Sequence, residues 1–149
     1  MKSAVVIGGS GFLGSHVADE LSEAGFNVKI YDLSVSKWKK HNQQTIIGSI
    51  LDREHLTKAL KDTDVVYNFA ALADLNDALN KPLETATINI IGNLNVLEAC
   101  RINKVKHFVY ASTVYVNSSE GGFYRCSKRA SEDFIKEFKK LYNLDYTIL

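Results

Sequence analysis

Short apolar runs alternate with amphipathic stretches along the whole chain. Each run has the length of a β-strand, and most runs are continuously apolar, which is typical of strands buried on both faces of a parallel sheet. The predicted strands are Ser3–Ile7, Asn27–Tyr31, Thr45–Ile47, Asp64–Asn68, His107–Ala111 and Asp145–Leu149.

The stretches between these runs place apolar residues at helical spacing. The first apolar face comprises Phe12, Val17, Leu21 and Ala24, and Gly25 follows it in the position of a C-cap. Three more helices are marked by Leu56 and Leu60, by Ile88, Ile91, Leu94, Val96, Leu97 and Cys100, and by Phe123, Ala130, Phe134, Phe138 and Leu141. Strands alternating with helices predict an α/β fold, a doubly wound (Rossmann) parallel sheet of about six strands with helices on both faces.

The composition narrows the classes of protein without changing this fold. The 149 residues are 46% hydrophobic and 23% charged, which is typical of one globular domain spanning residues 1–149. The net charge of +1 gives no electrostatic reason to expect nucleic acid or a membrane surface as a partner. No apolar run approaches the ~20 residues of a membrane span. Cys100 and Cys126 offer neither a disulfide framework nor metal-ligand spacing, so we expect both to be packing residues, no metal, and a cytoplasmic location.

A glycine-rich segment follows the first predicted strand and opens the first predicted helix. Gly8, Gly11 and Gly14 recur every three residues, which permits a tight turn and lets backbone N–H groups approach a pyrophosphate. The helix N-terminus adds a favourable partial positive charge, and Gly14 lets the helix pack closely on the sheet. In this strand–loop–helix context the spacing predicts a dinucleotide site; the alternative is a glycine-rich turn without a ligand.

Asp32 ends the second predicted strand, eighteen residues after Gly14. A carboxylate there can accept hydrogen bonds from the adenosine ribose hydroxyls of NAD and would repel the 2′-phosphate of NADP. No arginine follows it, although Lys37, Lys39 and Lys40 are close in sequence. We therefore expect NAD as the cofactor; the alternative is that Asp32 only starts a turn.

Tyr124 and Lys128 are four residues apart near the start of the last predicted helix, so both lie on one face, one turn apart. To act as a base near neutral pH, the tyrosine needs its pKa lowered by roughly three units, or about 4 kcal/mol. A nearby ammonium and an oxidised nicotinamide can supply that lowering. Ser112 and Thr113 close the fifth strand, where a hydroxyl would face the ligand crevice; the alternative is an ordinary strand end.

Together these residues resemble the extended short-chain dehydrogenase/reductase superfamily, and within it the NAD-dependent epimerase/dehydratase family of nucleotide-sugar enzymes. The resemblance covers nearly the whole chain, and it is specific because several blocks recur in the same order. These blocks are Gly8–Gly14, Asp32, Gly48–Asp52, Asn68–Ala71, Asn89–Asn93, Ala111–Tyr115 and Tyr124–Lys128.

The resemblance implies a role for each block. Ser49 stands where the family usually has Asp, and Asn68 replaces the commoner His. The implied cofactor contacts are Phe12 and Leu13 at the pyrophosphate, Asp32 on the adenosine ribose, Ser49 and Ile50 beside the adenine, Phe69, Ala70 and Ala71 along the crevice, Asn89 in support of the catalytic region, and Lys128 on the nicotinamide ribose.

The implied activity is that of a nucleotide-sugar epimerase, with hydride transfer at a sugar carbon and Tyr124 as base. Lys128 would be its partner, and Thr113 matches the catalytic hydroxyl, with Ser112 as the nearby possibility. The 4,6-dehydratases that resemble this family have an Asp-Glu pair after the Thr. Val114 follows Thr113 instead, which favours epimerase or reductase chemistry.

Two other functions stay open. One is a non-catalytic NAD-binding module, or a fragment that needs a partner chain. The other is a single-domain NAD(P)-dependent short-chain reductase, a group whose usual Gly-x-x-x-Gly-x-Gly loop does not match the spacing of Gly8, Gly11 and Gly14.

Members of the family continue into a C-terminal substrate domain, so the chain corresponds to the N-terminal cofactor-binding part, without that domain. Its expected partners are a nucleotide-sugar substrate and a second copy of the chain. Related enzymes pair through the helices that hold the blocks of Asn89 and Tyr124. The candidate residues for such a seam are Ile91, Leu94, Phe134 and Phe138; the alternative is that they only cover the sheet.

Overall fold

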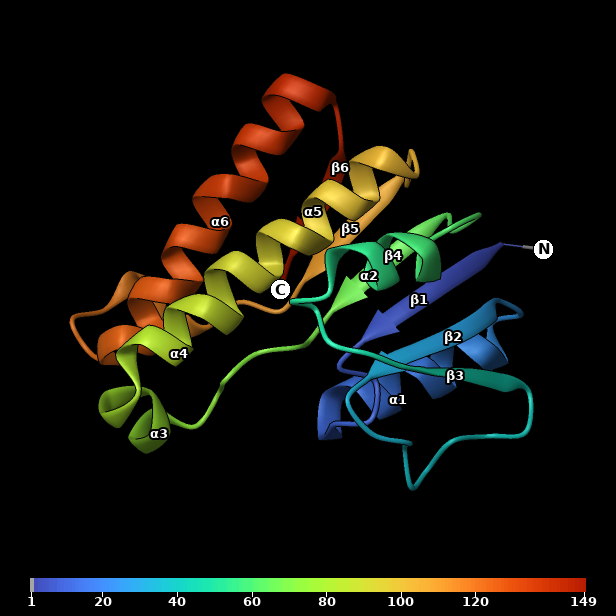
Figure 1. The fold of residues 1–149 in the computed structure, drawn as a ribbon, viewed down its shortest axis with the longest axis horizontal. Coiled ribbons are helices and arrows are strands. Elements are labelled where there is room, and N and C mark those ends of the chain that lie inside the picture. The colour runs from blue at the N-terminus through green and yellow to red at the C-terminus, as the bar shows by residue number, and fades with distance from the viewer. Residues whose placement is uncertain (1) are drawn as a thin grey trace.

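The computed structural model describes residues 2–149. One parallel sheet forms its centre, with the strand order β3-β2-β1-β4-β5-β6 (Figure 1). All six predicted strands form, each within two residues of its predicted bounds, so the predicted α/β fold class is confirmed. The strands are β1 (Ser3–Ile7), β2 (Asn27–Asp32), β3 (Gln43–Ile47), β4 (Val65–Asn68), β5 (His107–Tyr110) and β6 (Asp145–Ile148).

The register aligns the carboxyl ends of the strands along one edge of the sheet. Ile7 at the end of β1 pairs with Tyr31 on one side and with Asn68 on the other. Asn68 in turn pairs with Tyr110, and Tyr110 with Ile148. Since β1 lies between β2 and β4, the chain connections diverge at β1, and ligands of doubly wound sheets bind at such a switch point.

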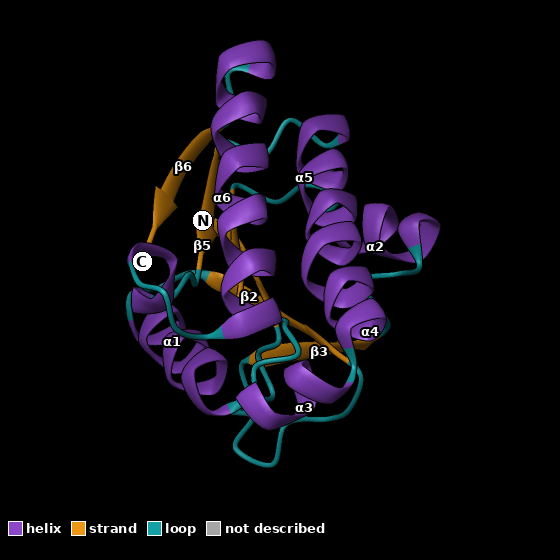
Figure 2. Cartoon of the chain, turned by 90° about the vertical axis from the view of Figure 1, so that its left-hand side faces the viewer, coloured by secondary structure: helices purple, strands orange, loops and turns teal. Residues whose placement is uncertain are grey.

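Helices cover the two faces of the sheet unequally. Figure 2 shows α1 on one side of the sheet, and α2, α5 and α6 on the other. The helical segments are α1 (Phe12–Glu23), α2 (Arg53–Ala59), α3 (Leu75–Asn80), α4 (Pro82–Ala86), the π-helix η1 (Thr87–Gly92), α5 (Asn93–Ile102), the 3₁₀-helix η2 (Val114–Asn117) and α6 (Gly122–Tyr142).

The alternation of side chains along β1 divides the core in two. Ala4 and Val6 pack with Ala18 and Leu21 of α1. Val5 and Ile7 face the opposite side, in the larger cluster formed with α2, α5 and α6. A strand buried on both faces has no polar alternation, which explains why its sequence is continuously apolar.

The buried face of α1 is the predicted one only in part: Leu21 is buried and Val17 packs against the core. Phe12 is 77% exposed and Ala24 is exposed, whereas Gly14, Ser15, Ala18 and Leu21 are buried. Small side chains face the sheet because α1 starts against the glycine-rich turn and lies close to β1. The predicted end is confirmed: Gly25, with φ +83°, directly follows the C-cap residue Ala24.

The buried face of α6 was also wrongly predicted from its apolar residues. Among these, Phe138 is buried, whereas Phe123, Phe134 and Leu141 are exposed. Polar side chains occupy the inner positions instead because they bond to neighbouring backbone and side-chain groups, as described below. The buried residues of α6 are Ser127, Lys128, Ser131, Ile135 and Phe138.

The long helix predicted from Ile88 to Cys100 is present as η1 and α5, continuous with α4. Helices α3 and η2 and the π-helical geometry of η1 were not predicted. Cys100 is buried as expected, but Cys126 is exposed, so the packing role predicted for Cys126 is wrong. Between residues 2 and 149, no helix has the combined length and apolarity needed to cross a membrane. No His, Cys, Asp and Glu side chains in that range cluster as metal ligands.

Candidate cofactor-binding and catalytic site

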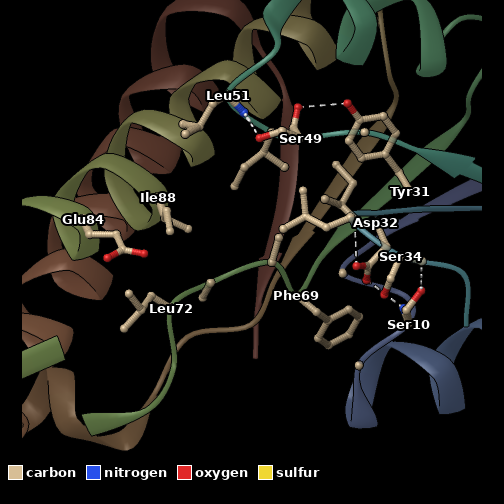
Figure 3. A pocket seen from close by; sticks show the side chains of 18 of the residues that line it. Ser10, Tyr31, Asp32, Ser34, Ser49, Leu51, Phe69, Leu72, Glu84 and Ile88 are labelled. Carbon is tan, nitrogen blue, oxygen red and sulfur yellow. Dashed lines mark hydrogen bonds between the residues drawn. The ribbon is translucent and has the colours of Figure 1, made fainter. Parts of the chain in front are cut away.

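A cleft of about 670 Å³ opens at the carboxyl ends of β1, β2 and β4, at the switch point of the sheet. This volume suits a cofactor or another small molecule. Figure 3 shows Ser10, Asp32 and Phe69 on one side of the cleft, and Ile88 and Glu84 on the other. The lining residues include Gly8, Ser10, Gly11, Asp32, Ser34, Ser49, Ile50, Leu51, Phe69, Ala70, Ala71, Leu72, Glu84 and Ile88.

The glycine-rich turn is held in a shape that excludes side chains at two positions. Gly8 has a φ of +75°, and a Cβ atom there would lie 2.7 Å from the backbone nitrogen of Ala70. A Cβ atom at Gly14 would collide with the carbonyl oxygen of Gly8. Gly11 is the exposed N-cap of α1, and its N–H donates to the Gly8 carbonyl (3.1 Å). The predicted roles of Gly8 and Gly14 in the turn and in close packing therefore have a direct steric basis.

The N-terminus of α1 presents backbone donors to an anion. The first intrahelical hydrogen bond runs from Ser15 N to Gly11 O (3.0 Å). The N–H groups of Phe12, Leu13 and Gly14 therefore precede the helical ladder, and no side-chain cap or acidic residue occupies the first turn. These donors and the helix dipole fit a pyrophosphate, as the sequence predicts.

Asp32 lies at the end of β2, next to this turn. Its Oδ2 accepts from Ser10 N (2.9 Å) and its Oδ1 accepts from Leu33 N (2.7 Å). Each carboxylate oxygen can accept a further hydrogen bond, so the fixed side chain can still bind a pair of ribose hydroxyls. Ser10 Oγ donates to Ser34 O (2.8 Å), which fixes the turn against the loop after β2.

The structure brings most of the predicted cofactor-site residues together, but not all. The cleft is lined by Gly8, Gly11, Asp32, Ser49, Ile50, Phe69, Ala70 and Ala71. Phe12 and Leu13 are 77% and 60% exposed at the start of α1, outside the lining. Gly14 and Asn89 are buried behind the cleft. Sequence reasoning missed Ser10 and Ser34, whose side chains face the cleft because of turn geometry, and Glu84 and Ile88, whose helix α4–η1 was predicted only in part.

Asn89 supports the cleft from behind. It lies on the π-helix η1 and is 2% exposed. Its Oδ1 accepts from Leu72 N (2.7 Å), and its Nδ2 donates to Leu72 O (3.1 Å) and to Ser127 Oγ (2.9 Å). Ser131 Oγ donates to the Asn89 carbonyl (2.8 Å). One side chain thus joins the loop that lines the cleft to α6, which carries Tyr124.

Tyr124 and Lys128 lie one turn apart on α6, as their spacing predicts. Lys128 is 3% exposed, and its Nζ donates to the carbonyl oxygen of Ala111, just beyond β5 (2.6 Å). The Nζ lies 4.6 Å from the centroid of the Tyr110 ring and 5.7 Å from that of the Tyr124 ring. Neither Tyr124 nor Lys128 lines the cleft, and Asn89 connects their helix to it.

Burial dominates the electrostatics of this pair. It raises the pKa of the Tyr124 phenol, and the neighbouring Tyr115 raises it further. Burial also lowers the pKa of Lys128 to about 8. Tyr124 therefore keeps its proton at neutral pH in this structure. Base catalysis requires a lowered pKa of Tyr124, and the protein alone does not lower it.

The two candidate hydroxyls after β5 have different surroundings. Ser112 Oγ donates to Glu132 Oε1 (2.5 Å), one turn beyond Lys128 on α6. Thr113 caps η2, and its Oγ1 accepts weakly from Tyr115 N (3.4 Å). The proton of Ser112 is thus engaged by Glu132, a residue not singled out from the sequence, whereas the Thr113 hydroxyl can still donate.

The fold and the cleft define the Rossmann class, whose members bind dinucleotides at the switch point of a parallel sheet. Residues 4–149 match the family model described as the NAD dependent epimerase/dehydratase family, and the chain belongs to this family. The family resemblance inferred from the motifs is thereby confirmed.

Known relatives include nucleotide-sugar epimerases. The putative UDP-glucose 4-epimerase of Methanocaldococcus jannaschii is 29% identical over 164 residues, covering 97% of this chain and 53% of the relative. UDP-glucose 4-epimerase from Thermotoga maritima, solved with UDP-glucose, has a TM-score of 0.89 and 31% identity, covering 98% of this chain and 54% of that protein. UDP-glucose 4-epimerase from Thermus thermophilus, solved with NAD, has a TM-score of 0.88 and 28% identity, covering 99% and 54%. The chain spans about half the length of these relatives.

Proposed function

We propose that the chain is the NAD-binding part of a nucleotide-sugar epimerase. One observation carries the proposal: the sheet edge that holds the glycine turn and Asp32 also holds the half-buried Tyr124 and the buried Lys128, and Asn89 joins the two regions. The observed groups fit NAD. The glycine-rich turn and the free helix N-terminal donors suit the pyrophosphate, and Asp32 suits the adenosine ribose.

The proposed chemistry assigns a role to each residue near β5. NAD, when bound, supplies the hydride acceptor and a positive charge near the base. Tyr124 removes the proton from a sugar hydroxyl, and the Thr113 hydroxyl bonds to the same oxygen. Lys128 holds the nicotinamide ribose and favours the phenolate through its charge. Ser112, engaged by Glu132, fixes the backbone that presents Thr113.

The substrate proposed for the complete site is a UDP-sugar, because the named relatives are UDP-glucose 4-epimerases. The proposed assembly is a homodimer through the faces of α5 and α6, and the proposed location is the cytoplasm. The exposed free thiol of Cys126 suits a reducing compartment.

A second function is favoured by the separation of the two parts of the site, because neither Tyr124 nor Lys128 lines the cleft. The chain would then bind NAD without turnover, or act only with a partner that completes the substrate site. Interconversion of UDP-glucose and UDP-galactose by the isolated chain would exclude this second function.

Cofactor titration tests the first function. Calorimetry of the purified chain should show micromolar binding of NAD and at least about tenfold weaker binding of NADP, because Asp32 repels the 2′-phosphate. In Asp32→Asn the preference for NAD over NADP should be smaller, since the charge that repels the 2′-phosphate is gone. In Lys29→Gln, a variant on the same strand outside the cleft, it should persist. Failure of the chain to bind either dinucleotide would contradict the proposal.

A further inference from the structure

One carboxylate on the cleft wall has no partner within the part of the chain that the structure describes. Glu84 lies on α4, and Figure 3 shows its side chain pointing into the cleft with no hydrogen bond to the residues drawn. Lys81, one turn away, pairs with Asp77 instead (3.6 Å). Glu84 is exposed to solvent, so its carboxylate is free to accept hydrogen bonds from a ligand in the cleft.

Two isoleucines, Ile50 and Ile88, line the cleft together with Glu84. Ile50, after β3, fits against Gly92 so closely that a Cβ atom there would collide with the Ile50 side chain. Asn95 Nδ2 also donates to the Ile50 carbonyl (2.9 Å). Ile88 and Glu84 precede Gly92 by four and eight residues, so they follow one another toward the mouth of the cleft, roughly one turn apart.

This arrangement forms a slot for a flat apolar ring. Ile50 and Ile88 both line the cleft and are largely shielded from solvent. Both contribute apolar surface to this part of the cleft, and the exposed Glu84 lies on the same side as Ile88 (Figure 3). The slot is beside Asp32 and the loop after β3, where the adenosine end of a dinucleotide lies in a Rossmann fold. Its apolar surface and its position suit the adenine base.

The other polar groups at this end of the cleft already make hydrogen bonds within the protein. Ser49 Oγ accepts from Leu51 N (3.1 Å), and Ser49 O accepts from Tyr31 Oη (2.9 Å). Both oxygens of Asp32 accept from backbone N–H groups. Glu84 is the carboxylate that has its full accepting capacity, and an ionised carboxylate can only accept hydrogen bonds.

Glu84 lies away from the glycine turn, which is the proposed binding site of the phosphates. Figure 3 shows Ser10 of the glycine turn and Glu84 on opposite sides of the cleft. A pyrophosphate on the glycine turn is thus separated from the carboxylate, which leaves Glu84 available to the base at the other end of the ligand.

We propose that Glu84 selects the adenine base by accepting a hydrogen bond from its exocyclic amino group. The inference rests on the proposed NAD-binding function and adds a base-specificity residue to it. A base that carries a carbonyl oxygen in place of the amino group presents an acceptor to the carboxylate, and two acceptors repel each other. The site therefore discriminates adenine from hypoxanthine dinucleotides by about five- to tenfold, the lower range for a hydrogen bond to an exposed charged group.

Calorimetry with NAD and with nicotinamide hypoxanthine dinucleotide tests this role. The unmodified chain should bind NAD about five- to tenfold more tightly than the hypoxanthine analogue. Glu84→Gln should bring the two affinities to within about twofold, because its amide can donate to the hypoxanthine carbonyl as well as accept from adenine. Glu137→Gln, an equal change of charge on the surface of α6, should keep the original preference.

The outcomes separate the inference from the function on which it rests. Binding of neither dinucleotide by the unmodified chain overturns the proposed function and this inference together. Tight NAD binding without a base preference, or a preference that survives Glu84→Gln, overturns the inference alone. Loss of the preference in Ser49→Ala but not in Glu84→Gln assigns the amino group to Ser49 and overturns it as well. A Glu84→Gln effect confined to the NAD-to-NADH affinity ratio places the carboxylate at the nicotinamide, with the same consequence.

Discussion

At the residue scale, Lys128 is the most costly side chain in the proposed site. Its ammonium is buried, with one hydrogen bond to the Ala111 carbonyl and the face of the Tyr110 ring nearby. Burial without a counter-charge penalises the charged form, so the pKa falls to about 8. Lys128 therefore lowers the stability of the domain but places a positive charge beside Tyr124.

Replacing Lys128 with Met should therefore stabilise the protein at neutral pH. The folded-state pKa of about 8 lies below the unfolded value of about 10.4, so burial of the cation costs about 3 kcal/mol at pH 7. After loss of the bond to Ala111, a net gain of about 2 kcal/mol is expected in urea unfolding. Between the two pKa values the unfolded chain binds more protons, so the stability of the unmodified protein rises with pH and the difference shrinks.

Two results would contradict this account of Lys128. One is a Lys128→Met protein that is less stable than the unmodified chain at pH 7. The other is a stability difference that stays constant from pH 7 to 10. The same variant should lose the NAD-dependent chemistry, which separates its effect on stability from its effect on function.

At the element scale, the π-helix η1 links the parts of the site. Its wider turn interrupts the helical run from α4 to α5 at the position where Asn89 reaches both backbone groups of Leu72. Such π-turns are frequent at functional sites because they redirect a side chain that a regular helix would place elsewhere. The cleft-lining loop and α6 are therefore held by one side chain rather than by direct contact.

Asn89→Ala should release that loop. The N–H and C=O of Leu72 would each lose a buried partner, at a cost of about 2 kcal/mol in unfolding free energy. The amide of Leu72 should exchange with deuterium at least about tenfold faster, whereas core amides of β1 keep their relative protection. Asn103→Ala also removes two hydrogen bonds, to Thr57 and Ala99, but it lies at the far end of α5 and should leave the Leu72 amide unchanged. Unaltered exchange at Leu72 in Asn89→Ala would contradict the role of Asn89.

The elements differ in how far the sequence predicted them. The strands followed from their apolar runs, because burial on both faces leaves a direct compositional trace. The buried faces of α1 and α6 did not, since glycine, serine and lysine occupy inner positions there for reasons of close packing and hydrogen bonding. Asn89 was found through the family resemblance, but its π-helical setting has no local sequence pattern. Glu132 was missed because its partner Ser112 is distant in the chain.

At the scale of the whole molecule, the uneven cover of the sheet leaves apolar surface on the outer sides of η1 and α6. Ile91 and Phe134, both predicted for a dimer seam, are 51% and 41% exposed. Phe138, predicted for the same seam, is buried in the core instead, because it faces the sheet. Figures 1 and 2 show α5, which continues η1, side by side with α6.

A charge on that surface should prevent association. Light scattering coupled to size exclusion should give a dimer for the unmodified chain and a monomer for Phe134→Glu, because pairing would bury the new carboxylate. Trp38→Glu introduces the same charge at another exposed apolar position, in the loop after β2, and should remain dimeric. A monomeric unmodified chain at high concentration would contradict the proposed homodimer.

The packing of the glycine turn also determines how its sequence can drift over evolutionary time. A Cβ atom at Gly8 would collide with the backbone of Ala70, and one at Gly14 with the carbonyl oxygen of Gly8, so neither residue can change unless the local backbone changes with it. Gly11 is exposed, has an extended backbone, and its nearest obstacle to a Cβ atom is the Gly8 oxygen at 3.3 Å. Steric contacts with the backbone therefore prevent substitution of Gly8 and Gly14, whereas Gly11 is preserved only to the extent that a bound ligand requires it. Among descendants of this chain, substitutions of Gly11 would thus indicate that the cleft has stopped binding its ligand.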